Sequence, residues 1–217
     1  MTQALELVVT APIVSFRNPL YSGLQVGLPC PPPSTVGGLL AAAAGSWDRV
    51  PENTRFAMGF HAAGSGIDLE TYHPLGSRGT STNSTIKDRD FLARTRLTVW
   101  LTKDIDLWER ALRRPVWPLR LGRSQDLAAA RTRRIELAAG PGAQGNAVVP
   151  DGLPQATGTR MRLTTAVALD RSRARWDGYR YAALGTAGRI DTGLATSDGQ
   201  AVALLPPVHP AQLAVAS

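Results

Sequence analysis

The best candidates for chemistry in this sequence are arginines that lie beside hydroxyl, glycine or aromatic residues. Arg17 stands between Phe16 and Asn18, directly after Ser15, in a long connection that precedes a predicted helix. A guanidinium in such a loop can bind a phosphate, and the neighbouring ring can stack on a base. A salt bridge for Arg17 and a core position for Phe16 are the structural alternatives. These four residues are therefore candidates for nucleic-acid contact.

Two further groups contain small or hydroxyl-bearing residues that let an anion come close to the backbone. They are Ser34, Thr35 and Gly37 at the start of the predicted helix, and Arg120, Gly122, Arg123 and Ser124 after a later one. The free N–H groups of a helix N-terminus attract anions, although capping of the first turn would explain Ser34 equally well. In the second group, glycine allows a phosphate to approach the backbone. Both groups are predicted anion sites.

Basic residues also occur on one predicted strand and on a hairpin. Arg94 and Arg96 share a strand face with Trp100, which indicates either a basic surface with an aromatic ring or a plain solvated face. The basic residues on or near the polar tip of the hairpin are Arg78, Lys87 and Arg89. Charge on such a tip often serves only solubility, but a hairpin that grips RNA would need the same residues.

The residues that usually carry catalysis or bind metals are sparse. His61, His73 and His209 share no ligand spacing, and Cys30 has no second cysteine with which to form a disulfide or a metal pair. No Gly-Lys-Ser or Gly-Lys-Thr phosphate loop occurs. We therefore predict no catalytic residue, no metal and no cofactor.

A strand, a long connection and a small-residue helix position the first candidates. Residues 5–9 alternate in polarity as a strand with one buried face does. Residues 12–33 form a connection well above the usual length for a strand-to-helix loop, and its prolines forbid helix before Ser34. The glycines and alanines of residues 37–44 leave little side chain on the helix, so its backbone can lie very close to its neighbours.

The remaining patterns complete a β-α-β-β-α-β order over residues 1–124. A second strand is predicted at 56–60, Gly64 and Gly66 mark a reversal into a hairpin, and a further strand, a helix and a short strand follow at 93–101, 105–114 and 119–121. This is the ferredoxin-like layout, which RNA-recognition domains also use. The hairpin is an insertion at about 67–92.

The rest of the chain, residues 125–217, predicts a small β-rich C-terminal region. Strands are expected around 160–169, 179–184 and 200–205, between clusters of glycine and proline. The predicted fold class is therefore α+β, with a ferredoxin-like domain of the RNA-recognition type at the N-terminus.

The charge balance favours an anionic partner without identifying it. The formal net charge is +7 and the sequence pI is about 10.5. Lys87 and Lys103 are the two lysines among 24 basic residues. Arginine suits phosphate, but a GC-rich genome would produce the same bias. The longest apolar stretch, residues 36–45, is too short to cross a membrane, and the sequence predicts a cytoplasmic protein.

Two segments resemble a known family. Ser15-Phe16-Arg17-Asn18-Pro19, followed by the Pro-Pro-Ser-Thr-Val-Gly-Gly-Leu-Leu-Ala-Ala run of residues 32–42, is similar to the N-terminal signature of the CRISPR-associated Cas-five family, a branch of the RAMP superfamily. Residues 117–124, Trp-Pro-Leu-Arg-Leu-Gly-Arg-Ser, are similar to the Leu-Gly-Arg segment that closes the first domain of that family.

The resemblance implies a non-catalytic subunit of a type I CRISPR surveillance complex (Cascade), most similar to type I-B, that binds the single-stranded 5′ handle of the crRNA. It implies that the inserted hairpin is a thumb, that backbone (Cas-seven type) and large (Cas-eight type) subunits are partners, and that target DNA is reached indirectly through the complex. Members of one branch, in type I-C systems, cut precursor RNA with a Tyr, Lys and His set, and this chain has no Lys-His neighbours. The alternatives are a metal-independent endoribonuclease for CRISPR repeat RNA, and a ferredoxin-like module that binds a protein or metabolite.

Overall fold

The computed structural model describes residues 1–21, 26–72 and 84–213. The elements within these residues are β1 (Thr2–Val14), α1 (Pro33–Ala44), the short 3-10 helix η1 (Trp47–Arg49), β2 (Ala57–Tyr72), β3 (Thr85–Leu101), α2 (Ile105–Arg113), β4 (Ala129–Ala139), β5 (Gly142–Ala143), β6 (Ala147–Pro150), β7 (Thr159–Val167), β8 (Ala174–Tyr181), β9 (Arg189–Ile190), β10 (Leu194–Ala195) and η2 (Pro210–Leu213). Strands dominate, and helices are few. None of the described helices is both long enough and apolar enough to span a bilayer.

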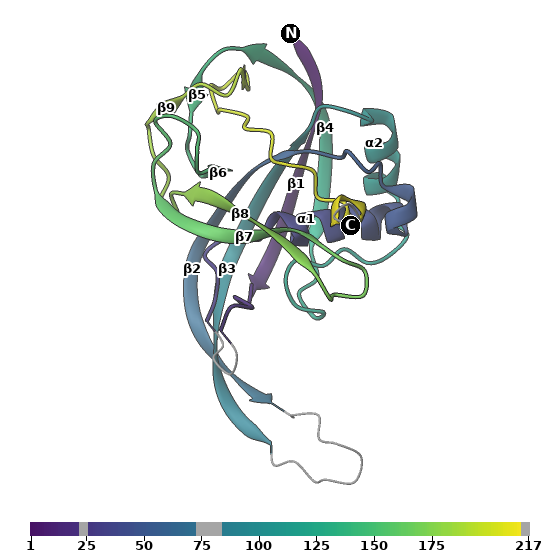
Figure 1. Ribbon diagram of the computed structural model, residues 1–217, viewed down its shortest axis with the longest axis vertical. Helices are drawn as coiled ribbons and strands as arrows, with labels where there is room; N and C mark the ends of the chain where they lie inside the picture. The colour runs from purple at the N-terminus through teal and green to yellow at the C-terminus, as the bar shows by residue number, and fades with distance from the viewer. Residues whose placement is uncertain (22–25, 73–83, 214–217) are drawn as a thin grey trace.

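One curled antiparallel sheet organises the molecule (Figure 1). Its strand order is β10-β4-β1-β3-β2-β6-β8-β7, and β5 and β9 pair separately. The first six long elements follow the predicted order of strand, helix, strand, strand, helix, strand. β1 lies at the centre of this unit because it pairs with β3 on one side and β4 on the other.

The last strand of that unit is β4, and the short strand predicted at 119–121 was wrong. Residues 119–121 form only an isolated bridge, from Arg120 to Leu127. The alternation of apolar and polar residues that marks a strand is weak in β4, because the residue that faces α2 is an arginine, Arg134. Arg134 donates to Asp106 (2.5 Å) and Glu109 (2.6 Å) of α2 in place of an apolar contact.

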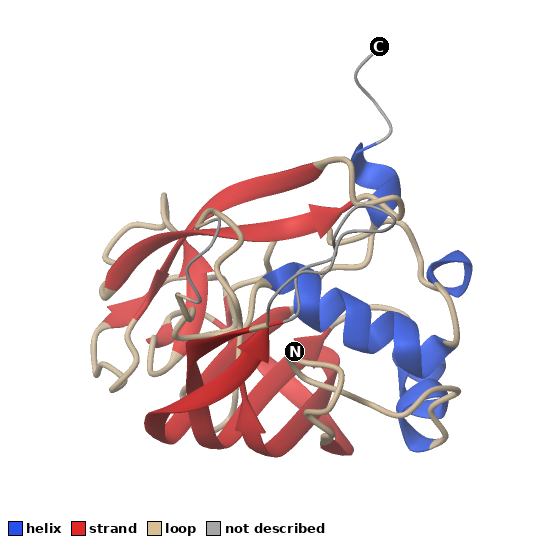
Figure 2. Ribbon diagram, turned by 90° about the horizontal axis from the view of Figure 1, so that it is seen from below, coloured by secondary structure: helices blue, strands red, loops and turns tan. Residues whose placement is uncertain are grey.

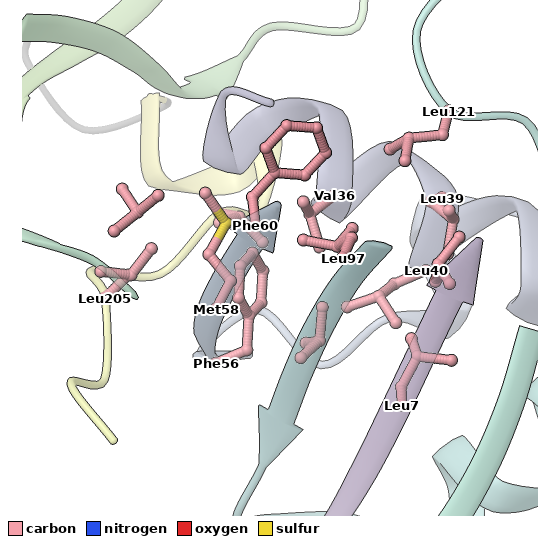
Figure 3. Close-up of a cluster of buried hydrophobic side chains, with 14 of the residues drawn as sticks. Leu7, Val36, Leu39, Leu40, Phe56, Met58, Phe60, Leu97, Leu121 and Leu205 are labelled. Carbon is pink, nitrogen blue, oxygen red and sulfur yellow. The ribbon is translucent and has the colours of Figure 1, made fainter. Parts of the chain in front are cut away.

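Both helices cover one face of the sheet, and the main core lies between this face and the helices (Figure 2). Leu5, Leu7 and Val9 of β1 point to this side and are fully buried, as their alternation predicts. Figure 3 shows Leu7 and Leu97 of the sheet close to Leu40 and Val36 of α1, with the ring of Phe60 beside Val36. Burying each such side chain contributes about 1.5–3 kcal/mol, so this contact fixes the position of α1.

The start of α1 differs from the prediction. The helix begins at Pro33 with Pro32 as its N-cap, and no side chain caps it, so the alternative interpretation of Ser34 as the cap of the first turn was wrong. The Ser34 hydroxyl instead lies 2.7 Å from the hydroxyl of Thr164 in β7. Proline is favoured in the first turn because its missing N–H has no partner there anyway, and this preference outweighs the hydroxyl cap.

The hairpin is a continuous extension of β2 and β3 that reaches away from the sheet (Figure 1). The predicted reversal at Gly64 and Gly66 was wrong, because β2 runs through both residues without a break. A Cβ on Gly66 would lie 2.6 Å from Cζ of Phe91, so this glycine makes room for a ring on the paired strand. The predicted tip, including Arg78, lies in part outside the described residues, since 73–83 are not described.

The C-terminal part extends the sheet and also covers its second face. β7 lies where a strand was predicted at 160–169, whereas β8 begins five residues before the strand predicted at 179–184 and overlaps it only at 179–181. Both strands continue the sheet through β6. The strand predicted at 200–205 was wrong, since Ala201 forms only an isolated bridge to Ala195. Val202 and Leu194 instead pack on Trp100, on the face opposite the helices.

Candidate functional site

The base of the β2–β3 ribbon joins residues from distant parts of the sequence. Ser15 donates from its hydroxyl to the carbonyl oxygen of Asp90 (2.7 Å), and its backbone N–H donates to Oδ2 of Asp126 (3.3 Å). Gly122 has a φ of +102°, and a Cβ there would lie 2.8 Å from the carbonyl oxygen of Ser15. The structure thus brings two predicted site residues together. The space beside Gly122, which was predicted to admit a phosphate, is taken by the backbone of Ser15.

Arg89 and Arg123 belong to the same network and are engaged with carboxylates. Arg89 pairs with Glu70 and donates from Nε to the hydroxyl of Ser15 (3.2 Å). Arg123 pairs with Asp126 (3.0 Å), and its guanidinium is 3.9 Å from Asp68. The Arg123 side chain is only 11% exposed. Both arginines therefore fix the loops to the base of the ribbon and offer little free charge.

The rest of the first loop divides between core and surface. Phe16 is buried, and its ring meets that of Phe60 edge to face at 5.8 Å. Its ring is thus part of the core and is covered from solvent. Arg17 is exposed, and Asn18 is half-buried with its side chain accepting from the N–H of Leu20. No described residue bonds to the guanidinium of Arg17, so its charge is free for a ligand.

A hollow of about 360 Å³ lies beside α1. Thr35 and Gly38 of α1 line one side, and Trp117 and Arg120 from the segment after α2 line the other. A Cβ on Gly38 would meet nothing within 4 Å, so the helix backbone is open to solvent at this point. Arg120 is exposed. The hollow therefore combines an accessible backbone, an exposed guanidinium and an aromatic ring.

Trp117 is the residue of this hollow that the sequence reasoning missed. Its indole Nε1 donates to the carbonyl oxygen of Gly45 (2.9 Å), and its backbone N–H donates to the carbonyl oxygen of Ala42 (3.2 Å). These bonds satisfy carbonyl groups at the end of α1 and hold the ring in place. The residue nevertheless remains 58% exposed. A large aromatic residue within a segment of prolines and arginines was the signal that could have found it.

The strand face of Arg94 and Arg96 is only partly as predicted. Both arginines are exposed, but Trp100 on the same face is buried under Val202, and its Nε1 donates to Glu6 (3.3 Å). The ring of Trp100 is therefore covered and cannot stack on a base here. The C-terminal segment that covers it carried no sequence signal for its position.

The remaining candidates lie apart from the hollow. A Cβ on Gly37 would lie 2.9 Å from Val208 and 3.0 Å from Trp47, so the C-terminal segment covers this glycine. Ser124 is exposed, and Lys87 is half-buried on the ribbon.

Groups suited to acid-base or metal chemistry do not gather within the described residues. No cluster of histidine, cysteine and carboxylate side chains there could hold a metal ion. Burial raises the pKa of the Cys30 thiol, and it raises the pKa of Tyr179 to about 12. The ring of His209 is tied to the carbonyl oxygen of Trp47 (3.0 Å), whereas His61 is exposed on the open sheet face.

A family model described as "CRISPR-associated protein (Cas_Cas5)" matches residues 4–186. The chain belongs to this family. The resemblance noted in the sequence to the Cas-five family is thereby confirmed, and it extends beyond the two matching segments into the C-terminal region. A search of curated proteins finds no match.

Solved structures resemble this Cas-five protein at low sequence identity. A chain described as "CRISPR RNA-guided surveillance complex" matches with a TM-score of 0.54 and 18% identity, over 97% of this chain and 92% of that one. A chain described as "Crystal structure of Cas protein" matches with a TM-score of 0.46 and 18% identity, over 95% of this chain and 99% of that one. A CRISPR protein from Archaeoglobus fulgidus matches with a TM-score of 0.49 and 13% identity, over 94% of this chain and 99% of that one. The first of these likenesses shows the fold.

Proposed function

We propose that this chain is a non-catalytic RNA-binding subunit of a type I CRISPR surveillance complex, most similar to those of type I-B, and that it caps the 5′ handle of the crRNA. Membership of the Cas-five family and the fold shared with a chain of a surveillance complex support this role. Its partners are then the crRNA, the backbone and large subunits and, through them, target DNA. Such a complex acts in the cytoplasm.

The observation that carries the proposal is the hollow beside α1. Trp117 presents an exposed ring there, Arg120 presents an exposed guanidinium, and Gly38 leaves the helix backbone open. A splayed single-stranded nucleotide needs these features, because its base stacks on a ring while its phosphate pairs with arginine. Arg17, exposed in the long loop after β1, supplies a further phosphate contact.

We also infer that the ferredoxin-like domain extends through β4, and that the β2–β3 ribbon is the thumb. β4 pairs with β1 along residues 2–10, so a boundary at residue 124 would separate two neighbouring strands of one sheet. The C-terminal region then begins after Ala139. The ribbon projects from the sheet in Figure 1, as a thumb that passes between nucleotides must.

Among the residues that the structure describes, His61, Lys103 and the hydroxyl of Tyr181 do not come together, which argues against the endoribonuclease alternative. His61 is paired with Arg96 on β3, and Lys103 lies beyond the end of β3 at Leu101. Leu101 is five residue steps along the strand from Arg96, or about 17 Å. The hydroxyl of Tyr181 is buried and donates to the carbonyl oxygen of Phe60 (2.9 Å). A general acid and base around a 2′-hydroxyl need closer groups than these.

Handle binding is tested by purifying the complex and measuring the affinity of the full chain for handle RNA. We expect co-purifying crRNA and an affinity that falls with salt, with a slope of roughly −0.7 per phosphate contacted. Repeat RNA incubated with the protein in a chelator should stay intact. Cleavage under those conditions would overturn the non-catalytic role, and a salt-independent affinity without bound RNA would overturn RNA binding.

A further inference from the structure

The sheet face opposite the helices carries a trough lined by arginines. β1 forms its floor with short side chains such as Val8 and Thr10, because β1 lies between β3 and β4. The arginines that flank this floor are Arg94 and Arg96 on β3 and Arg131 and Arg133 on β4. The registers place Thr10 beside Arg96 and Val8 beside Arg131. The two rows of arginine thus stand on either side of one strand.

The dimensions of the trough suit a single nucleic-acid strand. Hollows of about 690 Å³ and 410 Å³ lie along it, and Arg96 lines both of them. Neighbouring strands are about 4.8 Å apart, so the backbones of the two arginine rows are about 10 Å apart. Within a row, alternate residues are about 7 Å apart. A groove of this kind, with positive charge along its length, is how proteins follow the backbone of a single strand.

The guanidinium groups of the trough are mostly unpaired. Arg94, Arg96 and Arg131 are exposed, and none of residues 1–21, 26–72 and 84–213 accepts a hydrogen bond or an ion pair from their side chains. Arg133 is the exception, because Nε donates to Glu6 (2.7 Å) at the end of the trough that the C-terminal segment closes. Arg134, on the same strand but facing α2, is paired with two carboxylates. On β4, the arginine that faces α2 is thus neutralised, whereas Arg131 on the open face keeps its charge.

The backbone of Arg94 is in a conformation that is unfavourable for a residue with a side chain. Its φ is +49°, in the left-handed region, although it lies within β3 between two regularly paired residues, Ala93 and Thr95. Glycine would adopt this conformation freely, whereas a residue with a Cβ does not. Strain of this kind is kept where the surrounding fold holds it, and it concentrates at functional sites. An arginine at a position that favours glycine points to a role for the guanidinium.

The trough has no exposed aromatic ring among the described residues that line it. Trp100 lies under Val202, and the other lining side chains are aliphatic, hydroxyl or charged. Base stacking is therefore unavailable, and contacts to the sugar-phosphate backbone remain.

We propose that this trough is a second nucleic-acid site, which binds the phosphodiester backbone of a single strand without reading its sequence. It goes beyond capping of the 5′ handle, since it lies on the sheet face opposite α1 and the hollow beside it. Guide RNA and target-derived DNA are the two sources of such a strand, because both present the same phosphodiester backbone.

The test compares two triple variants that remove the same charge from opposite sides of the sheet. The trough variant is Arg94→Gln/Arg96→Gln/Arg131→Gln, and the control is Arg110→Gln/Arg113→Gln/Arg114→Gln, whose arginines are exposed at the end of α2. Each full-length protein is titrated with oligouridylate and with oligothymidylate of the same length over a range of salt. We expect the trough variant to lose about tenfold or more in affinity at low salt and its salt slope to fall by about 2. The control should change by less than twofold.

Equal losses in the two triple variants would overturn the proposal, because net charge alone would then explain binding. A greater loss for oligouridylate assigns the trough to guide RNA, and a greater loss for oligothymidylate assigns it to DNA. Both results support the site. Unchanged binding of handle RNA by the trough variant, alongside weaker binding of oligouridylate, would separate this site from the hollow beside α1.

A single variant separates a binding role of Arg94 from a structural one. Arg94→Gly removes the guanidinium and relieves the left-handed backbone, so we expect an unchanged or higher Tm together with weaker oligonucleotide binding. A lower Tm with unchanged affinity would assign Arg94 to the fold and overturn its part in the trough.

Discussion

Gly122 and Ser15 meet backbone to backbone, since a Cβ on Gly122 would lie 2.8 Å from the carbonyl oxygen of Ser15 and 3.2 Å from its nitrogen. This contact holds the loop after α2 against the connection after β1, and Asp126 reinforces it by accepting from the N–H groups of Ser15 and Arg123. The two segments that carry the family resemblance are thus physically joined at the base of the ribbon.

Substitution of Gly122 by alanine should destabilise the protein. The new Cβ would clash with the backbone of Ser15, and φ of +102° is strained for any residue but glycine, so we expect a loss of about 2–4 kcal/mol in the free energy of unfolding. Gly38→Ala is the matched control, because its Cβ meets nothing within 4 Å and alanine favours a helix by about 1 kcal/mol. Denaturant unfolding measures both. Similar effects of the two variants would contradict the close contact.

Arg123→Ala should act on stability, because its guanidinium is the charged partner of the buried carboxylate of Asp126. Removing one partner of a buried pair costs about 3–5 kcal/mol. Arg17→Ala, at an exposed and unpaired side chain, should change the free energy of unfolding by less than about 0.5 kcal/mol. If Arg123→Ala had the same unfolding midpoint as the wild type, the ion pair would be unimportant for the fold.

Arg17→Gln and Arg120→Gln should weaken the binding of handle RNA without a change in Tm. Each substitution removes one phosphate contact in our account, so the salt slope of the affinity should fall by about 0.7 for each. Fluorescence anisotropy with labelled handle RNA over a salt series measures this. Wild-type slopes in both variants would remove these arginines from the interface.

Stability should fall at high pH as Tyr179 ionises. Burial raises the pKa of Tyr179 from 10.0 to about 12, while its hydroxyl lies 2.6 Å from that of Thr165. A folded-state pKa above the unfolded one means that the stabilisation is complete below pH 10 and is lost as the pH rises towards 12. The loss is on the order of 2 kcal/mol. Unfolding free energies from pH 9 to pH 12 measure it, and Tyr179→Phe should show a shallower decline; an identical decline would refute the role of this tyrosine.

The sequence predicted the parts of the fold that rest on alternation and on small residues. The buried side of β1 follows from Leu5, Leu7 and Val9, and the close packing of α1 follows from glycines such as Gly37. The polar hairpin was also predicted, but Gly66 was interpreted as a turn. A glycine that makes room for Phe91 across a strand pair cannot be distinguished from a turn glycine without the register.

The candidate site was harder to predict because charge pairing depends on residues distant in sequence. Arg89 and Arg123 have the same residue type as Arg17 and Arg120, yet carboxylates from β2 and from the loop after α2 neutralise the first two. Arg131 and Arg133 were missed because no strand was predicted at 129–139, and these residues were assigned to a separate C-terminal region. Only the pairing of β4 with β1 brings them opposite Arg96.

The most direct test of the central claim is photo-crosslinking of this chain to crRNA within the assembled complex, followed by sequencing of the attached nucleotides. Our account predicts crosslinks to the 5′ handle through peptides that contain Arg17, Trp117 and Arg120. Crosslinks confined to the guide region or to the 3′ end, or the absence of any RNA on this chain, would contradict it.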